Sequence, residues 1–243
     1  MIGRALRAQA RGAAGDVVLL GVALAALLLS LSLATGIPPD LADAPPAVRE
    51  ELVAPFDAVL ATYAGILAAV YGSFRYTIDR RDGVIAQRLM LESRWAMLMV
   101  RLLASALGGA VVAVAAVAGG RTALLVTMGG VPVHASAVAS TVALGATAAL
   151  WGLGVGIVVQ THLAALFAAT LSMGAGLLVA MFWSAGAVSL PLPALLGAFR
   201  FDVAALGIPA DGEFAPAAVP IAAGWTVLAV GAGAAVFLQR DVS

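Results

Sequence analysis

The sequence contains no cysteine and no lysine. Without cysteine, the chain can form neither a disulfide framework nor a thiolate metal site. Without lysine, it cannot contain the phosphate-binding loop G-x-x-x-x-G-K-[ST], whose lysine reaches the phosphates of a nucleotide. We therefore expect no ATPase site in this chain. If nucleotide energy drives the protein, ATP and Mg²⁺ are bound by a partner chain.

Charged residues are also scarce, because they make up 11% of the chain whereas hydrophobic residues make up 63%. A soluble domain cannot hide that much apolar surface in its core, so the solvent of this protein is lipid. Transmembrane barrels need strands in which apolar and polar residues alternate, whereas the apolar residues here form long unbroken runs. We therefore predict an all-α integral membrane protein, with residues 1–243 in a single domain.

Six apolar runs are long enough to cross a bilayer as helices. The predicted spans are residues 17–37, 58–75, 95–118, 135–159, 163–183 and 219–238. The first run follows a basic segment, as the apolar region of a signal peptide does, but it is longer than such a region usually is. We therefore expect it to be a membrane span.

The residues before the first span contain Arg4, Arg7 and Arg11 at spacings of three and four, which places them on one face of a helix. We expect this helix to lie in the membrane interface, with its arginines toward the lipid headgroups. The alternative is a frayed basic terminus that only sets the topology.

Three connections are rich in proline or glycine. Residues 38–57 contain five prolines and several acids, and we expect an outer loop with a short helix over residues 47–53. Residues 119–134 contain two glycine pairs and one proline, and we expect an outer connection that can dip into the membrane. Residues 184–218 contain four prolines, which favours an outer re-entrant or interfacial helix before the last span.

The residues from Arg75 to Arg101, which we call the arginine hairpin, form the only long charged segment of the chain. They contain six of the thirteen arginines and lie between two apolar runs. A segment between two spans lies in water, and its excess of arginine places it in the cytosol. Ten of the thirteen arginines are cytosolic in the resulting topology, which has both termini in the cytosol. The use of arginine in place of lysine suggests a GC-rich prokaryotic genome, and hence the cytoplasmic (inner) membrane.

A short helix is predicted inside the arginine hairpin. Asp82 and Gly83 can start it, and Ile85 and Leu89 follow on one face at i and i+4. Ser93 can then cap the third span. A short cytosolic helix between two spans can transmit a push from a soluble partner into the membrane. The alternative is a hairpin that only obeys the positive-inside rule.

No catalytic or metal site is expected. The sequence has neither H-E-x-x-H nor G-x-S-x-G, and His134 and His162 fall on opposite sides of the predicted topology. Arg101, inside the third span, is expected either to reach back to the headgroups or to pair with Glu92 or Asp79. Apart from it, no predicted span has a charged residue in its interior, which argues against a proton-driven pump.

Two short motifs resemble type-two ABC exporter permeases. The first is the stretch from Asp79 to Ile85, Asp-Arg-Arg-Asp-Gly-Val-Ile, followed by Leu89, Arg94 and Arg101. That family typically has an acidic residue, glycine and isoleucine before a basic residue that enters the third span. The second is the ending Phe-Leu-Gln-Arg-Asp-Val at 237–242, similar to the family's F-x-R-R-D-V. Val84 stands where the family often has threonine, and Gln239 where it often has arginine.

The resemblance covers the whole chain in layout, and it implies an ATP-driven exporter subunit for a hydrophobic or amphipathic substrate such as a drug, antibiotic, peptide or lipid. Such a permease pairs with a second permease, identical or a sister chain, and binds two copies of an ABC ATPase. The family lines its pathway with the second and fifth spans, which makes Tyr63, Tyr71, Phe167 and Met181 candidates. The implied ATPase contacts, around a coupling helix, are Asp79, Arg81, Asp82, Gly83, Val84, Ile85, Gln87, Arg88, Leu89 and Glu92.

Other functions remain open from the sequence. A stand-alone channel or secondary carrier would move solute without ATP, and a membrane anchor for a cytosolic partner would move none. Nothing in the composition indicates a nucleic-acid partner, since the formal net charge is zero.

Overall fold

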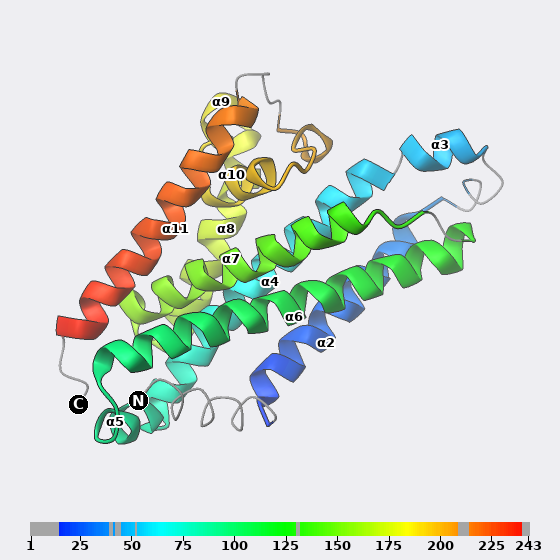
Figure 1. Cartoon of the computed structure of the whole chain (residues 1–243). Coiled ribbons are helices and arrows are strands. Elements are labelled where there is room, and N and C mark those ends of the chain that lie inside the picture. Colours follow the sequence, from blue (N-terminus) through cyan, green and yellow to red (C-terminus); the bar gives the residue numbers. More distant parts are fainter. Residues whose placement is uncertain are drawn as a thin grey trace.

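The computed structural model describes residues 15–38, 41, 45–51, 53–129, 132–208 and 214–239. The predicted interfacial helix with Arg4, Arg7 and Arg11, and the last three residues of the closing motif, lie outside these ranges. The elements are α2 (Val17–Ser32), η1 (Leu33–Gly36), α3 (Pro46–Glu51), α4 (Val53–Arg81), α5 (Val84–Leu89), α6 (Arg94–Met128), α7 (Ala135–Val159), α8 (His162–Ala180), α9 (Ser184–Ala187), α10 (Pro191–Ala198), η3 (Ala204–Leu206) and α11 (Phe214–Gln239) (Figure 1).

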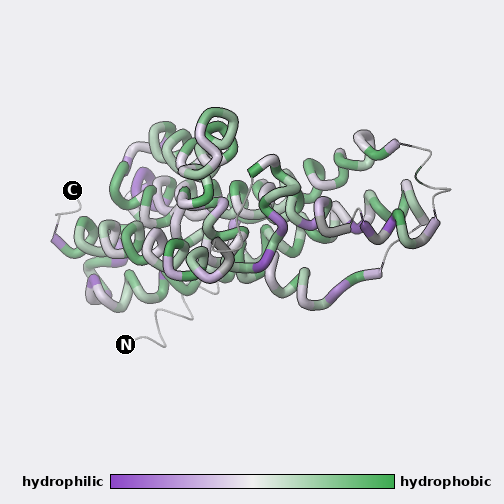
Figure 2. The backbone as a smooth tube through the Cα atoms, turned by 90° about the horizontal axis from the view of Figure 1, so that it is seen from above, coloured by the Kyte–Doolittle hydropathy of each residue, from purple (hydrophilic) through white to green (hydrophobic). Residues whose placement is uncertain are grey.

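The described part of the chain is helical and contains six helices that are long and apolar enough to cross a membrane. Hydrophobic residues follow most of the length of each of them (Figure 2). Many large apolar side chains on these helices are exposed, for example Leu20 on α2, Leu107 on α6 and Phe167 on α8. In water such a surface would be unstable, whereas lipid accepts it. The prediction of an all-α, multi-pass membrane protein is confirmed at this level.

The two ends of the bundle differ in what they contain. The start of α2, the end of α4, α5, the start of α6 and the end of α11 lie at one end, which we call the hairpin end (Figure 1). Helices α3, α9 and α10 lie toward the opposite end, which we call the far end. His162 contacts Phe74 near the hairpin end, whereas His134 precedes α7 at its far end, so the two histidines lie at opposite ends of the bundle.

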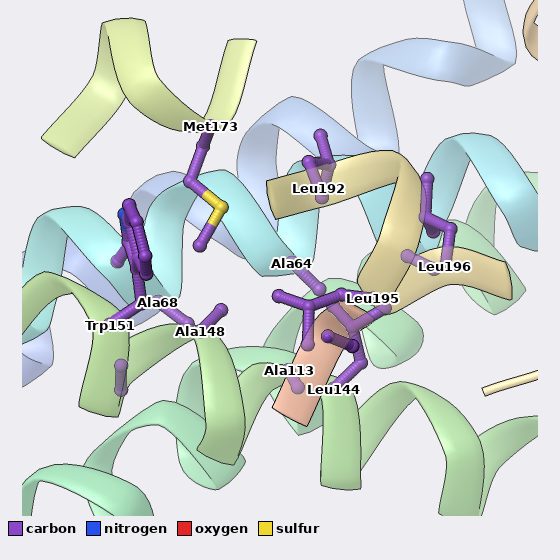
Figure 3. Packing of buried hydrophobic residues seen from close by; sticks show 14 of the residues in the cluster. Ala64, Ala68, Ala113, Leu144, Ala148, Trp151, Met173, Leu192, Leu195 and Leu196 are labelled. Carbon is purple, nitrogen blue, oxygen red and sulfur yellow. The ribbon is translucent and has the colours of Figure 1, made fainter. Parts of the chain in front are cut away.

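The core is built largely from small side chains on α4, α6 and α7. Ala64 and Ala68 of α4 meet Ala113 of α6 and Ala148 of α7 in one buried cluster (Figure 3). Helices without large side chains at their contact can approach until their backbones nearly touch, which favours association in lipid through dispersion forces.

Gly152 and Gly156, the G-x-x-x-G pair of α7, lie at this close contact. A Cβ atom at Gly152 would be 1.9 Å from the carbonyl oxygen of Ala69, and one at Gly156 would be 3.0 Å from the Cα of Ser73. Gly72 of α4 faces the carbonyl of Ala149 in the same way. The pair is therefore a packing site between α4 and α7.

Helix α10 fills the far end of the core. Leu192, Leu195 and Leu196 are buried in the same cluster as Leu144 of α7 and Met173 of α8 (Figure 3). Proline at the start of α10 suits a first helical turn, whose N–H groups have no partner inside the helix. The expected short helix is present, and it packs into the bundle between α8 and α11.

The prediction for residues 119–134 was wrong in its first part, because α6 continues through it to Met128. At 35 residues the helix is roughly 52 Å long, well beyond the thickness of a hydrocarbon core. Its glycines serve close contacts instead of turns: a Cβ at Gly119 would be 2.2 Å from the carbonyl oxygen of Leu27. The helix ends only at Gly129, which has a φ of +71°.

The other helix boundaries are close to the predicted spans. Helix α7 coincides with the predicted residues 135–159, and α11 begins five residues before the predicted 219. Helix α4 is longer than the predicted 58–75 at both ends and reaches Arg81. The expected helix in the outer loop is α3, over Pro46–Glu51.

The close contact between α4 and α7 leads to a prediction about stability. Gly152→Ala places a methyl group where the carbonyl of Ala69 lies, so the two helices must separate. We expect it to lower the free energy of unfolding by about 1–3 kcal/mol, measured by unfolding in detergent micelles. Gly174→Ala on α8 is the control, because a Cβ there meets nothing within 4 Å. Equal stability of Gly152→Ala and the wild type would contradict the packing role.

Candidate functional site

The arginine hairpin folds as two long helix ends joined by a short helix. Helix α4 ends at Arg81, and Gly83 reverses the chain with a φ of +72°, a conformation that glycine adopts without steric cost. Helix α5 then runs over Val84–Leu89. Ser93 caps α6, since its hydroxyl accepts a hydrogen bond from the N–H of Ala96 at 3.3 Å. The short helix and the cap agree with the sequence pattern.

Helix α5 is anchored to the bundle by Ile85 and, to a lesser extent, by Leu89. Ile85 is fully buried, in a cluster with Tyr76 of α4, Met97 and Leu98 of α6 and Phe237 of α11. Leu89, the second member of the predicted apolar stripe, packs against the same cluster and is half-buried. Leu153 and Ile157 of α7 also belong to this cluster, so a displacement of α5 would reach four membrane helices through it.

The turn after α5 exposes two large apolar side chains. Met90 is 87% exposed and Leu91 is 86% exposed. Both belong to the turn between α5 and α6, beyond the ends of the long helices. Adjacent exposed apolar residues with polar residues around them mark a contact site for a protein or a membrane more often than singly scattered apolar residues do. The sequence analysis did not single out either residue, although each follows Leu89 in an otherwise charged segment.

The other predicted contact residues are divided between surface and interior. Arg81, Asp82 and Gln87 are exposed, whereas Asp79 is buried with an exposed fraction of 3%. Partly buried positions are Gly83, Val84, Arg88 and Glu92. Asp79 therefore belongs to the structure at the base of the hairpin.

Four charged residues form this base, and we call them the ion-pair cluster: Asp79 and Arg101, which are buried, and Asp16 and Arg75, which are partly buried. Nη2 of Arg101 donates to Oδ2 of Asp79 at 2.8 Å, and Nη1 of Arg75 donates to Oδ1 of the same carboxylate. Nε of Arg75 is 2.8 Å from Oδ2 of Asp16. The cluster has no net charge, which is the condition for burying ionised groups in a low-dielectric interior.

The members of the cluster come from three helices: Asp16 from the start of α2, Arg75 and Asp79 from α4, and Arg101 from α6. Asp16 is the N-cap of α2, where Oδ1 accepts the N–H of Leu19 at 3.1 Å. Arg75 and Asp79 are one turn apart on α4, the spacing at which oppositely charged side chains meet. The guanidinium of Arg101 on α6 lies over the ring of Tyr76, 5.6 Å from its centroid. The cluster thereby ties the first three membrane helices together.

Arg101 makes the ion pair with Asp79 that was one of the two alternatives, and it does not reach back toward the headgroups. Its side chain is 4% exposed. The expectation that the spans carry no other charge needs correction near their ends, because α4 extends over both Asp57 and Asp79 and α6 extends over Arg121. Arg121 Nη2 donates to Asp57 at 2.8 Å, a second ion pair at the far end. The middle of each span is uncharged, as predicted.

Two further contacts hold the hairpin end. Nη1 of Arg94 donates to the carbonyl of Leu238 at 3.1 Å, at the C-terminal end of α11, where the helix dipole favours a cation. The hydroxyl of Thr77 lies 2.9 Å from Nδ1 of His162 at the start of α8. Sequence reasoning gave His162 no role, and only the folded chain brings it to α4.

The four pathway candidates do not share one environment. Tyr71 is buried, with its hydroxyl 3.4 Å from Oδ2 of Asp16 and its ring against Gly108. Tyr63 is half-buried on α4. Phe167 and Met181 are 61% and 76% exposed, on and just after α8. The structure thus places Tyr71 in the ion-pair region and the two residues of the fifth span on the outer surface.

The ion-pair cluster leads to a prediction about paired substitutions. Asp79→Asn leaves the cation of Arg101 buried without its counter-ion, so we expect it to lower the free energy of unfolding by about 3–5 kcal/mol. Adding Arg101→Met removes the stranded charge and is expected to restore more than half of that loss, measured by unfolding in detergent micelles. Arg81→Gln, on the exposed end of α4, is the control. A double variant no more stable than Asp79→Asn would rule out this account.

Comparison of the chain with models of known protein families, with curated proteins and with solved structures gives no match. The function of the chain therefore has to be inferred from its own residues and contacts.

Proposed function

We propose that this chain is the membrane-spanning permease subunit of an ATP-driven ABC exporter. The observation that carries the proposal is the form of the arginine hairpin: α5 is seated in the bundle by Ile85, while the adjacent Met90 and Leu91 are 87% and 86% exposed. Ile85 fixes the hairpin to the membrane helices, and the exposed Met90 and Leu91 are suited to contact a soluble protein.

The chemistry of the hairpin fits a protein partner. Exposed apolar side chains rimmed by charged groups are typical of interface anchors, which fill a pocket while the surrounding polar residues give specificity. Arg81, Asp82 and Gln87 are exposed on the same hairpin and supply such groups. The partner proposed is an ABC ATPase in two copies, which binds ATP and Mg²⁺, since this lysine-free chain has no phosphate-binding loop.

In the proposed mechanism, a movement of the ATPase is transmitted to the membrane helices through the hairpin. ATP-driven closure of the two ATPase subunits pushes α5, and the cluster around Ile85 passes the displacement to α4, α6, α7 and α11. The permease works as a dimer, with an identical or a sister permease, in the cytoplasmic (inner) membrane of a prokaryote. Its hairpin and both termini face the cytosol, and residues 2–14 lie in the interface. The cargo is hydrophobic or amphipathic, because the middle of every span is uncharged.

A secondary carrier is the second candidate, and the ion-pair cluster favours it. Ionisable residues buried within membrane helices commonly serve ion-coupled transport. Transport by the purified chain alone in vesicles, driven by an ion gradient without ATP, would support this candidate. The exposed pair Met90 and Leu91 would then have no role in transport.

The first test of the exporter proposal is what accompanies the chain from the membrane. Purification in mild detergent followed by native mass spectrometry is expected to give a P-loop ATPase in equal amount to the permease. A permease that purifies repeatedly without any ATPase, after mild crosslinking in cells as well, would count against the proposal.

The second test uses the exposed turn. Leu91→Glu places a charge in the proposed interface without disturbing the core, and we expect ATPase binding to weaken about thirtyfold or more, the loss of roughly 2 kcal/mol typical of an anchoring residue. Binding is measured by titration of the ATPase onto the permease in nanodiscs. Val133→Glu is the matched control, because Val133 is a 59% exposed apolar residue in the connection between α6 and α7 at the far end. Unchanged binding in Leu91→Glu would remove Leu91 from the interface.

Leu91 is a better position for this test than Ile85 or Gly83. Ile85 is fully buried, so a charged residue there would unseat α5 and disturb the fold. Gly83 has a positive φ, so any side chain there strains the turn. A loss of binding in either variant would not separate a lost contact from a lost fold.

A further inference from the structure

One specific contact holds the first part of α2 at the hairpin end. The carboxylate of Asp16 pairs with Nε of Arg75 at 2.8 Å, and the hydroxyl of Tyr71 donates to the same oxygen at 3.4 Å. Val18, Leu19 and Val22 also touch the core, but they are only partly buried. In a bilayer, lipid can replace such apolar contacts at little cost, since lipid chains are as apolar as the helix surface. The position of this part of α2 therefore depends mainly on the ion pair.

The second part of α2 is held differently. Its backbone at Leu27 lies against Gly119 of α6, so closely that a Cβ on the glycine would be 2.2 Å from the carbonyl oxygen of Leu27. Ala26 and Ser30, which are the buried residues described for α2, flank this contact. Close backbone packing over several residues fixes the far half of the helix.

A cavity lies beside the first part of α2. Its volume is about 360 Å³, and it is lined by the first turns of the helix from Gly15 to Ala23 and by Val111 of α6. The lining is almost entirely apolar, with Asp16 at one end. Among the described residues, a groove therefore lies between the outer side of the first half of α2 and Val111 of α6, whereas the second half of α2 packs backbone to backbone against α6.

Within the ion-pair cluster, the contact between Asp16 and Arg75 is the one that can open at least cost. The side chain of Arg75 is 20% exposed and that of its partner Asp16 is 5% exposed, whereas in the pair of Arg101 with Asp79 both side chains are nearly inaccessible, at 4% and 5%. After release, Arg75 would keep Asp79 as its counter-ion. Asp16 precedes the first turn of α2, at the end of the apolar run, where headgroups and water can solvate its carboxylate.

Helices α4 and α6 lack this freedom. They are joined by Asp79 and Arg101 near the hairpin end and by Asp57 and Arg121 near the far end. A movement of the arginine hairpin would therefore carry α4 and α6 together, and the ion pair from Arg75 decides whether the start of α2 follows.

We propose that the ion pair between Asp16 and Arg75 is a releasable latch, which holds the first half of α2 over the cavity beside α6 and, when it opens, lets that half swing away about the fixed contact at Leu27. In the permease proposed above, this latch would pass hairpin movement to the first span, and that role rests on the proposed function. The latch itself requires only that the chain spans a bilayer.

The absence of cysteine makes the latch accessible to paired spin labels. Cysteines replacing Leu20 and Leu107, which are 70% and 60% exposed, report the first half of α2 against α6. Cysteines replacing Leu28 and Leu125, which are 53% and 61% exposed, report the second half. Distance distributions are measured by pulsed electron resonance on the chain alone in lipid nanodiscs.

In Asp16→Asn and in Arg75→Gln we expect the Leu20–Leu107 distribution to broaden and to shift to longer distances by more than its wild-type width. The Leu28–Leu125 distribution is expected to stay as in the wild type. Asparagine is a good N-cap, so Asp16→Asn removes the charge without removing the cap of α2. Arg121→Gln, which breaks the ion pair at the far end, is the control and should leave the Leu20–Leu107 distribution unchanged.

An unchanged Leu20–Leu107 distribution in both latch variants would overturn the proposal. So would an equal change at both label pairs, because that indicates a general loosening of α2. The sample contains no ATPase and no nucleotide, so this result is independent of the exporter proposal. If the latch opens in the variants but the chain binds no ATPase, the latch is supported and the exporter proposal is not.

Discussion

The structure depends on the neutralisation of charge inside an apolar bundle. Asp79 and Arg101 are both almost completely buried and form an ion pair, and Arg75 pairs with the same carboxylate, so the buried charges are compensated locally. Their pairing allows α4 to continue as a helix past Arg75 to Arg81 and fixes the position at which α6 enters the bundle. The hairpin between the two helices is therefore held on a base that cannot shift without separating charges in a low dielectric.

Small residues supply the second condition, which is the close approach of α4, α6 and α7. Gly72, Gly109 and Gly152 each face the backbone of a neighbouring helix at a distance that leaves no room for a side chain. Lipid gives no hydrophobic driving force for helix association, so close packing of this kind has to hold the bundle together. Helix α2 shares it only over its second half, which explains why its first half depends on an ion pair.

Charge neutralisation and close helix packing together suggest how the proposed function could work. A rigid unit of α4, α6 and α7 carries a hairpin whose tip exposes Met90 and Leu91 and whose base contains the ion-pair cluster. A force applied at the tip would reach the membrane helices through Ile85 and would reach the first span through Arg75. The chain lacks the lysine that nucleotide binding of the P-loop type requires, so the proposed source of that force is a second protein.

The sequence by itself determined the class of fold, the number of membrane helices and the place of the hairpin. Apolar runs of span length must cross lipid as helices, and local rules such as the cap at Ser93 and the turn at Gly83 act within a few residues. The tertiary structure decided what each glycine and each charge does. Gly119 favours a break on local grounds, but contact with α2 keeps it in a helix. Asp16, Arg75 and Arg101 are 26 to 85 residues apart along the chain. The pairing of Asp16 with Arg75, and of Arg101 with Asp79, follows only once three helices lie side by side, because electrostatic contact depends on distance in space and not on separation in sequence.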